Sequence, residues 1–210
     1  MRQTEVNRIL YITIALTVAY MLILHYLEIS PFSIEGYKTI SSFFSVTIIG
    51  WGLYFYYGWK LPGLRAIIYK SNLNGTWMGT YFSKNIVSGE EYNGEIALVI
   101  RQTFLNLNVK SYTDKFLSYS FAETILHHRE SRSNQLIYMY SQNQFDPVDE
   151  GVRRGSTELH LVCESKSDKL FGDFYTNVGS HGKLKVVHMS AEHFDSFVDI
   201  KHFAELKGPK

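Results

Sequence analysis

Cysteine is nearly absent from this chain of 210 residues, and so is any excess of charge of one sign. The one cysteine, Cys163, excludes a disulfide framework and a cysteine-based zinc site. The formal net charge of +1 excludes a polyanion-binding tail, so we expect no DNA or RNA partner. The composition fits a reducing compartment.

Sequence signatures of enzymes are also lacking. The chain has no Gly-x-Ser-x-Gly, no Walker loop and no dinucleotide fingerprint. His127 and His128 are adjacent and would face opposite sides of a strand, and the other histidines lack a carboxylate at helical metal spacing. We therefore expect no enzymatic activity, no bound metal and no cofactor.

The chain does have two long, uncharged apolar runs, Ile9–Leu27 and Thr39–Trp59. Each has about 20 residues, which is the length that an α-helix needs to cross a hydrocarbon core roughly 30 Å thick. A transporter or proton relay would usually place a charge inside such a run. We predict a transmembrane hairpin over residues 1–62, with spans at about 9–28 and 39–59.

Basic residues indicate the orientation of this hairpin. The loop between the spans contains one basic residue, Lys38, whereas five flank the outer ends: Arg2, Arg8, Lys60, Arg65 and Lys70. Because basic residues stay on the cytoplasmic side, both termini are predicted to be cytoplasmic.

Small residues recur every four positions in the second run, at Ser42, Val46 and Gly50. Such a stripe lets helices approach closely in lipid. A plain anchor without special packing is the alternative, and the sequence leaves both open.

After a linker at residues 63–72, the chain changes to short stretches with a period of two, which is typical of β-strands. A helix is predicted at Ala191–Phe203. Eight strands joined mostly by tight turns predict that residues 73–210 form a cytoplasmic up-and-down barrel, lipocalin- or streptavidin-like, with a C-terminal helix. The predicted strands are Gly75–Phe82, Gly94–Gln102, Leu105–Ser111, Ser118–Leu126, Gln135–Gln142, Ser156–Cys163, Leu170–Thr176 and Lys183–Met189.

The alternation also predicts which side chains enter the barrel. Inward positions on three strands are Leu105, Leu107 and Val109; Leu159 and Leu161; and Leu170, Gly172, Phe174 and Thr176. The fourth strand permits two registers. One places Ser118, Ser120, Ala122 and Thr124 inside; the other places Leu117, Tyr119, Phe121 and Ile125 inside together with Glu123, whose charge weighs against it.

Several motifs along the chain resemble one family. The Gly-x-Trp at Gly75–Trp77 resembles the first strand of calycins, where the Trp caps one barrel end. Two spans followed by the motifs below resemble the two-transmembrane β-barrel effectors of bacterial CBASS antiphage systems, which are CD-NTase-associated proteins. The motifs are GTWMGTY, IRQTF (Ile100–Phe104), a serine-rich stretch at Ser118, Ser120 and Ala122, LFGDFYT (Leu170–Thr176), and Gly182 before the last strand.

This resemblance implies a function. The barrel would bind a cyclic dinucleotide made by a partner nucleotidyltransferase, the CD-NTase, during phage infection. Binding would drive self-association through the transmembrane helices, breach the bacterial inner membrane and kill the infected cell. The family's basic residues near the last barrel turn are not matched, since Asn177–Gly182 carries only His181.

A cyclic dinucleotide carries two phosphates and two flat bases, so its site needs rings and hydrogen-bond donors. Arg101 and Gln102 would point to opposite sides of one strand, and we favour Gln102 inside. Arg154 lies with Arg153 in a predicted loop, Asn143–Gly155, which forms either a ligand lid or a solvated salt-bridge network with its own acidic residues. The candidate ligand-binding residues are Tyr81, Arg101, Gln102, Thr103, Ser118, Ser120, Tyr140, Arg154, Tyr175, Thr176 and Asn177.

A second reading stays open. A passive, membrane-tethered barrel could hold an apolar small molecule or a peptide. That reading predicts a dry, ring-lined cavity and no toxicity.

Overall fold

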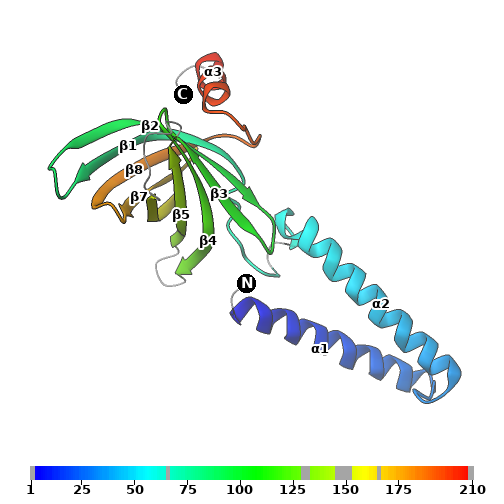
Figure 1. Cartoon of the computed structure of the whole chain (residues 1–210). Helices are drawn as coiled ribbons and strands as arrows, with labels where there is room; N and C mark the ends of the chain where they lie inside the picture. The colour runs from blue at the N-terminus through cyan, green and yellow to red at the C-terminus, as the bar shows by residue number, and fades with distance from the viewer. Residues whose placement is uncertain (1–2, 65–66, 129–132, 145–152, 165–166, 208–210) are drawn as a thin grey trace. The chain divides into compact units, whose positions relative to one another are not determined.

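The computed structural model describes the chain except for residues 1–2, 65–66, 129–132, 145–152, 165–166 and 208–210. The chain forms two compact units: Met1–Lys70 with Thr103–Leu105, and Ser71–Gln102 with Asn106–Lys210. The first contains two long helices, and the second is a closed eight-stranded antiparallel barrel followed by a helix (Figure 1). The predicted fold class is therefore confirmed.

The helical unit contains α1 (Gln3–Tyr26), α2 (Ile34–Tyr56) and the short 3-10 helix η1 (Gly58–Lys60). Ser33 starts α2, because its hydroxyl accepts a hydrogen bond from the Gly36 N–H at 2.9 Å. Both long helices are apolar and long enough to cross a membrane, and only 6% of each apolar stretch is buried.

Aromatic and hydroxyl side chains join the two helices of the hairpin. The Tyr20 ring stacks on Phe43 with centroids 4.1 Å apart, and its hydroxyl donates to the Thr39 carbonyl at 2.9 Å. The Trp51 indole donates to the Thr13 hydroxyl at 3.0 Å. The stripe of Ser42, Val46 and Gly50 is exposed, so small residues do not mediate the packing within the hairpin.

An aromatic cluster completes the helical unit. Phe104, at the centre of the three-residue segment Thr103–Leu105, is fully buried, and its ring stacks on Phe55 at 4.9 Å. Tyr54 and Trp59 pack edge-on against the same ring at 5.7 and 6.4 Å. This segment was predicted to belong to the barrel, with Leu105 facing its interior. That prediction was wrong, because Leu105 is 54% exposed and lies outside the strands.

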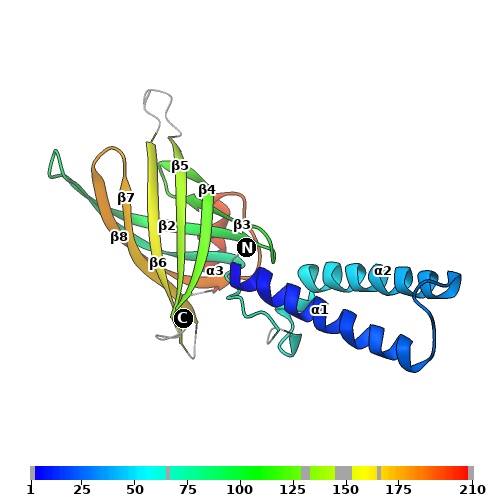
Figure 2. The same ribbon diagram turned by 90° about the horizontal axis from the view of Figure 1, so that it is seen from below.

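The barrel is a simple up-and-down meander in which each strand pairs with its neighbours in the sequence and β1 pairs with β8 (Figure 2). The strands are β1 (Gly75–Asn85), β2 (Glu91–Gln102), β3 (Leu107–Tyr112), β4 (Phe116–His128), β5 (Ser133–Gln144), β6 (Arg153–Cys163), β7 (Asp168–Thr176) and β8 (Ser180–Ser190). Most are longer than predicted, since the sequence alternation fades near the turns before the pairing does.

A bulge in β4 resolves the two registers that the sequence left open. The pairing with β5 shifts between Ser120 and Ala122, so that Phe121 is the extra residue. Before the bulge, Ser118 and Ser120 are buried; after it, Glu123 and Ile125 pair with the buried residues of β5. Each predicted register is therefore correct for one half of the strand.

The interior near the chain-entry end of the barrel is filled. Trp77 is 1% exposed, and its indole donates to the Leu73 carbonyl at 2.9 Å. Gln102 ties the entering chain to the end of β2: its amide donates to the Ser71 carbonyl at 2.8 Å and accepts from the Leu73 N–H at 2.7 Å. The inward leucines predicted on β6 and β7, Leu159, Leu161 and Leu170, join this core.

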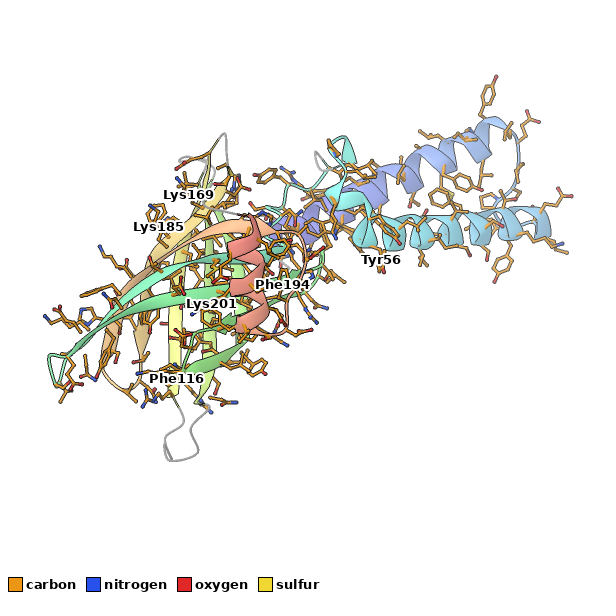
Figure 3. The ribbon with its side chains drawn as sticks, turned by 90° about the horizontal axis from the view of Figure 1, so that it is seen from above. Tyr56, Phe116, Lys169, Lys185, Phe194 and Lys201 are labelled. Carbon is orange, nitrogen blue, oxygen red and sulfur yellow. The ribbon has the colours of Figure 1, made fainter. Side chains whose placement is uncertain are left out.

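The C-terminal helix α3 (Phe197–Lys207) covers part of the outer face of the barrel (Figure 3). Phe197 and Ile200 are buried in a second cluster with Ala97 and Val99 of β2. These two β2 residues alternate with the lumen residues Leu98 and Ile100, so that β2 is apolar on both faces. This explains why its sequence reads as a continuous apolar run.

Candidate ligand-binding site

One end of the barrel opens into a cavity of about 580 Å³, which we call the mouth cavity. Up-and-down topology places the turns β1–β2, β3–β4, β5–β6 and β7–β8 at this end. The other end receives the chain and is filled by Trp77 and its neighbours. The volume lies within the range of small-molecule sites in proteins.

Aromatic rings enter the mouth cavity from four strands: Tyr81, Tyr138, Tyr140 and Phe174. Tyr81 meets Phe174 edge-on with centroids 6.5 Å apart, and Tyr138 and Tyr140 are tilted with centroids 5.9 Å apart. The sequence makes room for them: a Cβ atom at Gly155 would lie 2.5 Å from the Tyr140 hydroxyl. Rings exposed to such a cavity can stack on flat ligands.

Uncharged polar groups lie between the rings. They include Ser83, Ser118, Thr157, Thr176 and Gln142. Burial raises the pKa of the Tyr140 hydroxyl to about 12, and burial also raises the pKa of Tyr138. Both phenols therefore remain protonated at neutral pH and can donate hydrogen bonds to an anion.

Charged side chains line the outer part of the mouth cavity. The acidic ones are Glu90, Glu95 and Asp114, and the basic ones are Lys115 and Arg153. The Arg153 guanidinium lies 5.2 Å from the centroid of the Phe116 ring, at the barrel rim (Figure 3). Among the described residues, no three His, Cys, Asp or Glu side chains gather as metal ligands would.

Four of the predicted site residues lie in the mouth cavity: Tyr81, Ser118, Tyr140 and Thr176. They come from β1, β4, β5 and β7, and their side chains converge because all four occupy inward positions near the same barrel end.

Four others belong to the same half of the barrel but do not line the mouth cavity. The Ser120 hydroxyl accepts from the Val109 N–H at 2.8 Å and donates to the Glu123 carboxylate, so the bulge uses it. Tyr175 is 57% exposed on the outer face. Arg154 is exposed, and its backbone N–H donates to the Asn177 side chain at 2.8 Å.

The remaining three lie at the opposite end. Arg101 faces outward and pairs with Asp195 at 3.1 Å, whereas Gln102 is buried as predicted but is bonded to the entering chain. Thr103 belongs to the helical unit. Because β2 spans 12 residues, its two ends are roughly 35 Å apart, so one small ligand cannot reach both groups.

Alternation could have identified the lining residues that the sequence reading left out. Arg153 and Thr157 are in phase with the inward Leu159, whereas Arg154 is not; the predicted loop that held both arginines ends earlier, because β6 starts at Arg153. Its acidic residues, Asp146, Asp149 and Glu150, lie outside the described residues. Ser83 and Gln142 are likewise in phase with Tyr81 and Tyr140.

Comparison with known proteins gives two matches. The family model described as "Cap15, cyclic dinucleotide receptor domain" matches residues 70–187. The chain is also 28% identical over 192 residues to the CD-NTase-associated protein 15 of Staphylococcus schleiferi, a match that covers 87% of this chain and 96% of that protein. The first match contains the whole mouth cavity.

Proposed function

The chain belongs to the Cap15 cyclic dinucleotide receptor family, and from this premise we propose that the mouth cavity is where the ligand binds. The resemblance to CBASS barrel effectors noted in the sequence is thereby confirmed at the level of the family. The single observation that supports this location is the convergence of four rings and several hydroxyls in one open cavity inside the matched domain.

In this proposal the chemistry of the cavity divides between bases and phosphates. The faces of Tyr81, Tyr140 and Phe174 stack on the bases. Hydroxyl donors and the Arg153 guanidinium bind the phosphate oxygens, and the protonated state of Tyr140 suits a donor role. All of these groups bind, and none is arranged as a nucleophile with a base, so the barrel acts as a receptor without catalysing a reaction.

The helical hairpin is the effector part of the proposal. The helices α1 and α2 cross the bacterial inner membrane with both termini in the cytoplasm, where a CD-NTase supplies the ligand. Ligand that binds the clustered form more tightly than the dispersed form shifts the population toward clusters. Clustered hairpins then disrupt the membrane and kill the infected cell.

A passive barrel holding an apolar molecule or peptide fits the observed lining less well. That reading expects a dry interior, whereas Ser83, Ser118, Thr157 and Gln142 lie in the cavity. An apolar occupant would leave these groups without partners at a cost of about 1–3 kcal/mol each.

Calorimetric titration of the full chain in detergent micelles tests ligand binding. We expect saturable heat with at least one of cyclic di-AMP, cyclic di-GMP and cyclic UMP-AMP. Arg153→Met should weaken the binding about 10- to 100-fold, because a charge-assisted bond to phosphate contributes about 1.5–3 kcal/mol.

Arg154→Met is the matched control. It removes the same charge one position away on the exposed side of β6, and we expect little change in affinity. Equal losses in the two variants would place the ligand outside the mouth cavity. No binding by the unmodified chain to any of the three would overturn the proposed function.

A further inference from the structure

The charges that line the mouth cavity do not favour an anion on their own. Among the described residues, three acidic side chains, Glu90, Glu95 and Asp114, face two basic ones, Lys115 and Arg153. This lining has a net charge of −1, whereas a cyclic dinucleotide brings two negative phosphates. Charges of like sign at such short range repel by about 1 kcal/mol or more per pair even in water. Some other group must offset the acidic residues.

Lys201 of α3 is that group. Its Nζ lies 2.8 Å from the Asp114 carboxylate and 3.0 Å from the Glu95 carboxylate. Hydrogen bonds to Asp114 and then Glu95 raise the pKa of this amine, so Lys201 is positively charged at neutral pH. One lysine thus contacts two of the three acidic residues of the lining.

The structure holds Lys201 in this position from below. Its neighbour Ile200 is fully buried and Phe197 is 9% exposed, both packed on the outer face of the barrel. The Lys201 Nζ lies 4.6 Å from the centroid of the Phe197 ring, and the side chain is 31% exposed. Figure 3 shows Lys201 on α3, outside the barrel wall.

We propose that Lys201 is a specificity-determining residue for the anionic ligand, acting from outside the lumen. By pairing with Glu95 and Asp114 it brings the rim from a net charge of −1 to zero, so that Arg153 and Lys115 set the potential that the phosphates meet. This inference rests on the proposed function and extends it, since it gives the C-terminal helix a part in ligand recognition.

A purely structural clamp is the competing explanation. Pairs between Lys201 and the exposed carboxylates of Glu95 and Asp114 would then only attach α3 to the barrel. Exposed ion pairs contribute little to stability, whereas the field of an uncompensated carboxylate reaches a bound dianion within a Debye length of about 10 Å. The two explanations predict different effects on affinity.

The test is calorimetric titration of the full chain in detergent with the cyclic dinucleotide that binds it most tightly. We expect Lys201→Met to weaken binding about three- to tenfold, and the loss to shrink at high salt. Lys185→Met removes an equal charge from the exposed outer face of β8 and should leave affinity unchanged (Figure 3).

A gain of affinity decides between the explanations even if Lys201→Met folds poorly. With Lys201 intact, Glu95→Gln combined with Asp114→Asn should tighten binding about three- to tenfold, which loss of a clamp cannot produce. The same pair should restore affinity in Lys201→Met. Binding that is unchanged in all these variants overturns the role of Lys201 and leaves the receptor function standing; absence of binding by the unmodified chain overturns both.

Discussion

At the scale of single residues, alternation along a strand decides which side chains can reach the ligand. Arg153 lines the mouth cavity and Arg154 is exposed outside it, although the two are adjacent and chemically identical. The same difference separates Thr176 from Tyr175. A one-residue change of phase moves a side chain to the opposite face of the sheet, so residue type alone is a poor guide to a barrel site.

The two buried tyrosines predict how stability depends on pH. The folded barrel raises the pKa of Tyr140 to about 12, whereas an unfolded chain ionises near 10. The contribution of Tyr140 is therefore complete below pH 10 and is lost as pH rises through about 12. We expect the unfolding free energy of the unmodified barrel to fall over this range by roughly 2–3 kcal/mol for Tyr140.

Denaturant titration followed by circular dichroism between pH 8 and pH 12 measures this loss. Tyr140→Phe has no phenol to ionise, so the fall should be smaller in that variant. Tyr175→Phe makes the same chemical change on the exposed outer face and should behave as the unmodified chain does. Identical pH profiles for the two variants would contradict the expected role of burial.

At the scale of elements, local irregularities carry information that a regular pattern lacks. The bulge at Phe121 switches the inward set of β4 from Ser118 and Ser120 to Glu123 and Ile125. The polar half of the strand therefore faces the open end of the barrel and the apolar half faces its core. No regular two-residue period could produce both.

The junction of the entering chain with β2 is a second such irregularity, and it leads to a prediction. Both polar atoms of the Gln102 side chain are bonded to the backbone of Ser71 and Leu73 in a buried position. Gln102→Ala leaves these backbone groups without partners, and we expect a loss of about 2–4 kcal/mol in unfolding free energy. Denaturant titration measures the loss, and faster proteolysis near residues 63–72 should accompany it.

Gln102→Met separates the hydrogen bonds from the volume of the side chain. It keeps a chain of similar length but cannot bond, so it should be destabilised nearly as much as the alanine variant. Affinity for a cyclic dinucleotide should persist in both, because Gln102 lies at the end of the barrel opposite the mouth cavity. A methionine variant as stable as the unmodified chain would show that only volume matters here.

At the scale of the whole molecule, the two compact units suggest separable roles for sensing and for action. The barrel contains every residue of the mouth cavity, and the helical unit contains both apolar helices. Replacement of the hairpin by an unrelated two-span hairpin should therefore preserve ligand binding and abolish toxicity. Titration of the chimera in detergent and growth of cells that produce both the chimera and the ligand measure the two properties.

The control for the hairpin exchange keeps the native hairpin and carries Arg153→Met in the barrel. Toxicity should then require more ligand, since binding is weaker while the effector is intact. A chimera that still kills cells would show that the barrel, or membrane tethering alone, is sufficient for killing. A chimera that no longer binds ligand would show that sensing depends on the native helices.

The sequence by itself determined the fold class, the two apolar helices, eight strands and the family. Each of these follows from patterns of apolar residues that repeat over short distances, and such patterns reflect burial directly. Four of the eleven predicted site residues, Tyr81, Ser118, Tyr140 and Thr176, lie together in the mouth cavity.

Only the tertiary structure decided which barrel end is open, where the bulge falls, and that Phe104 packs with the helical unit. It also brought Lys201 to Asp114 across 87 positions of sequence. The physical reason is that barrel closure and helix docking join residues through pairings whose partners are distant in the chain, and no local periodicity records those partners.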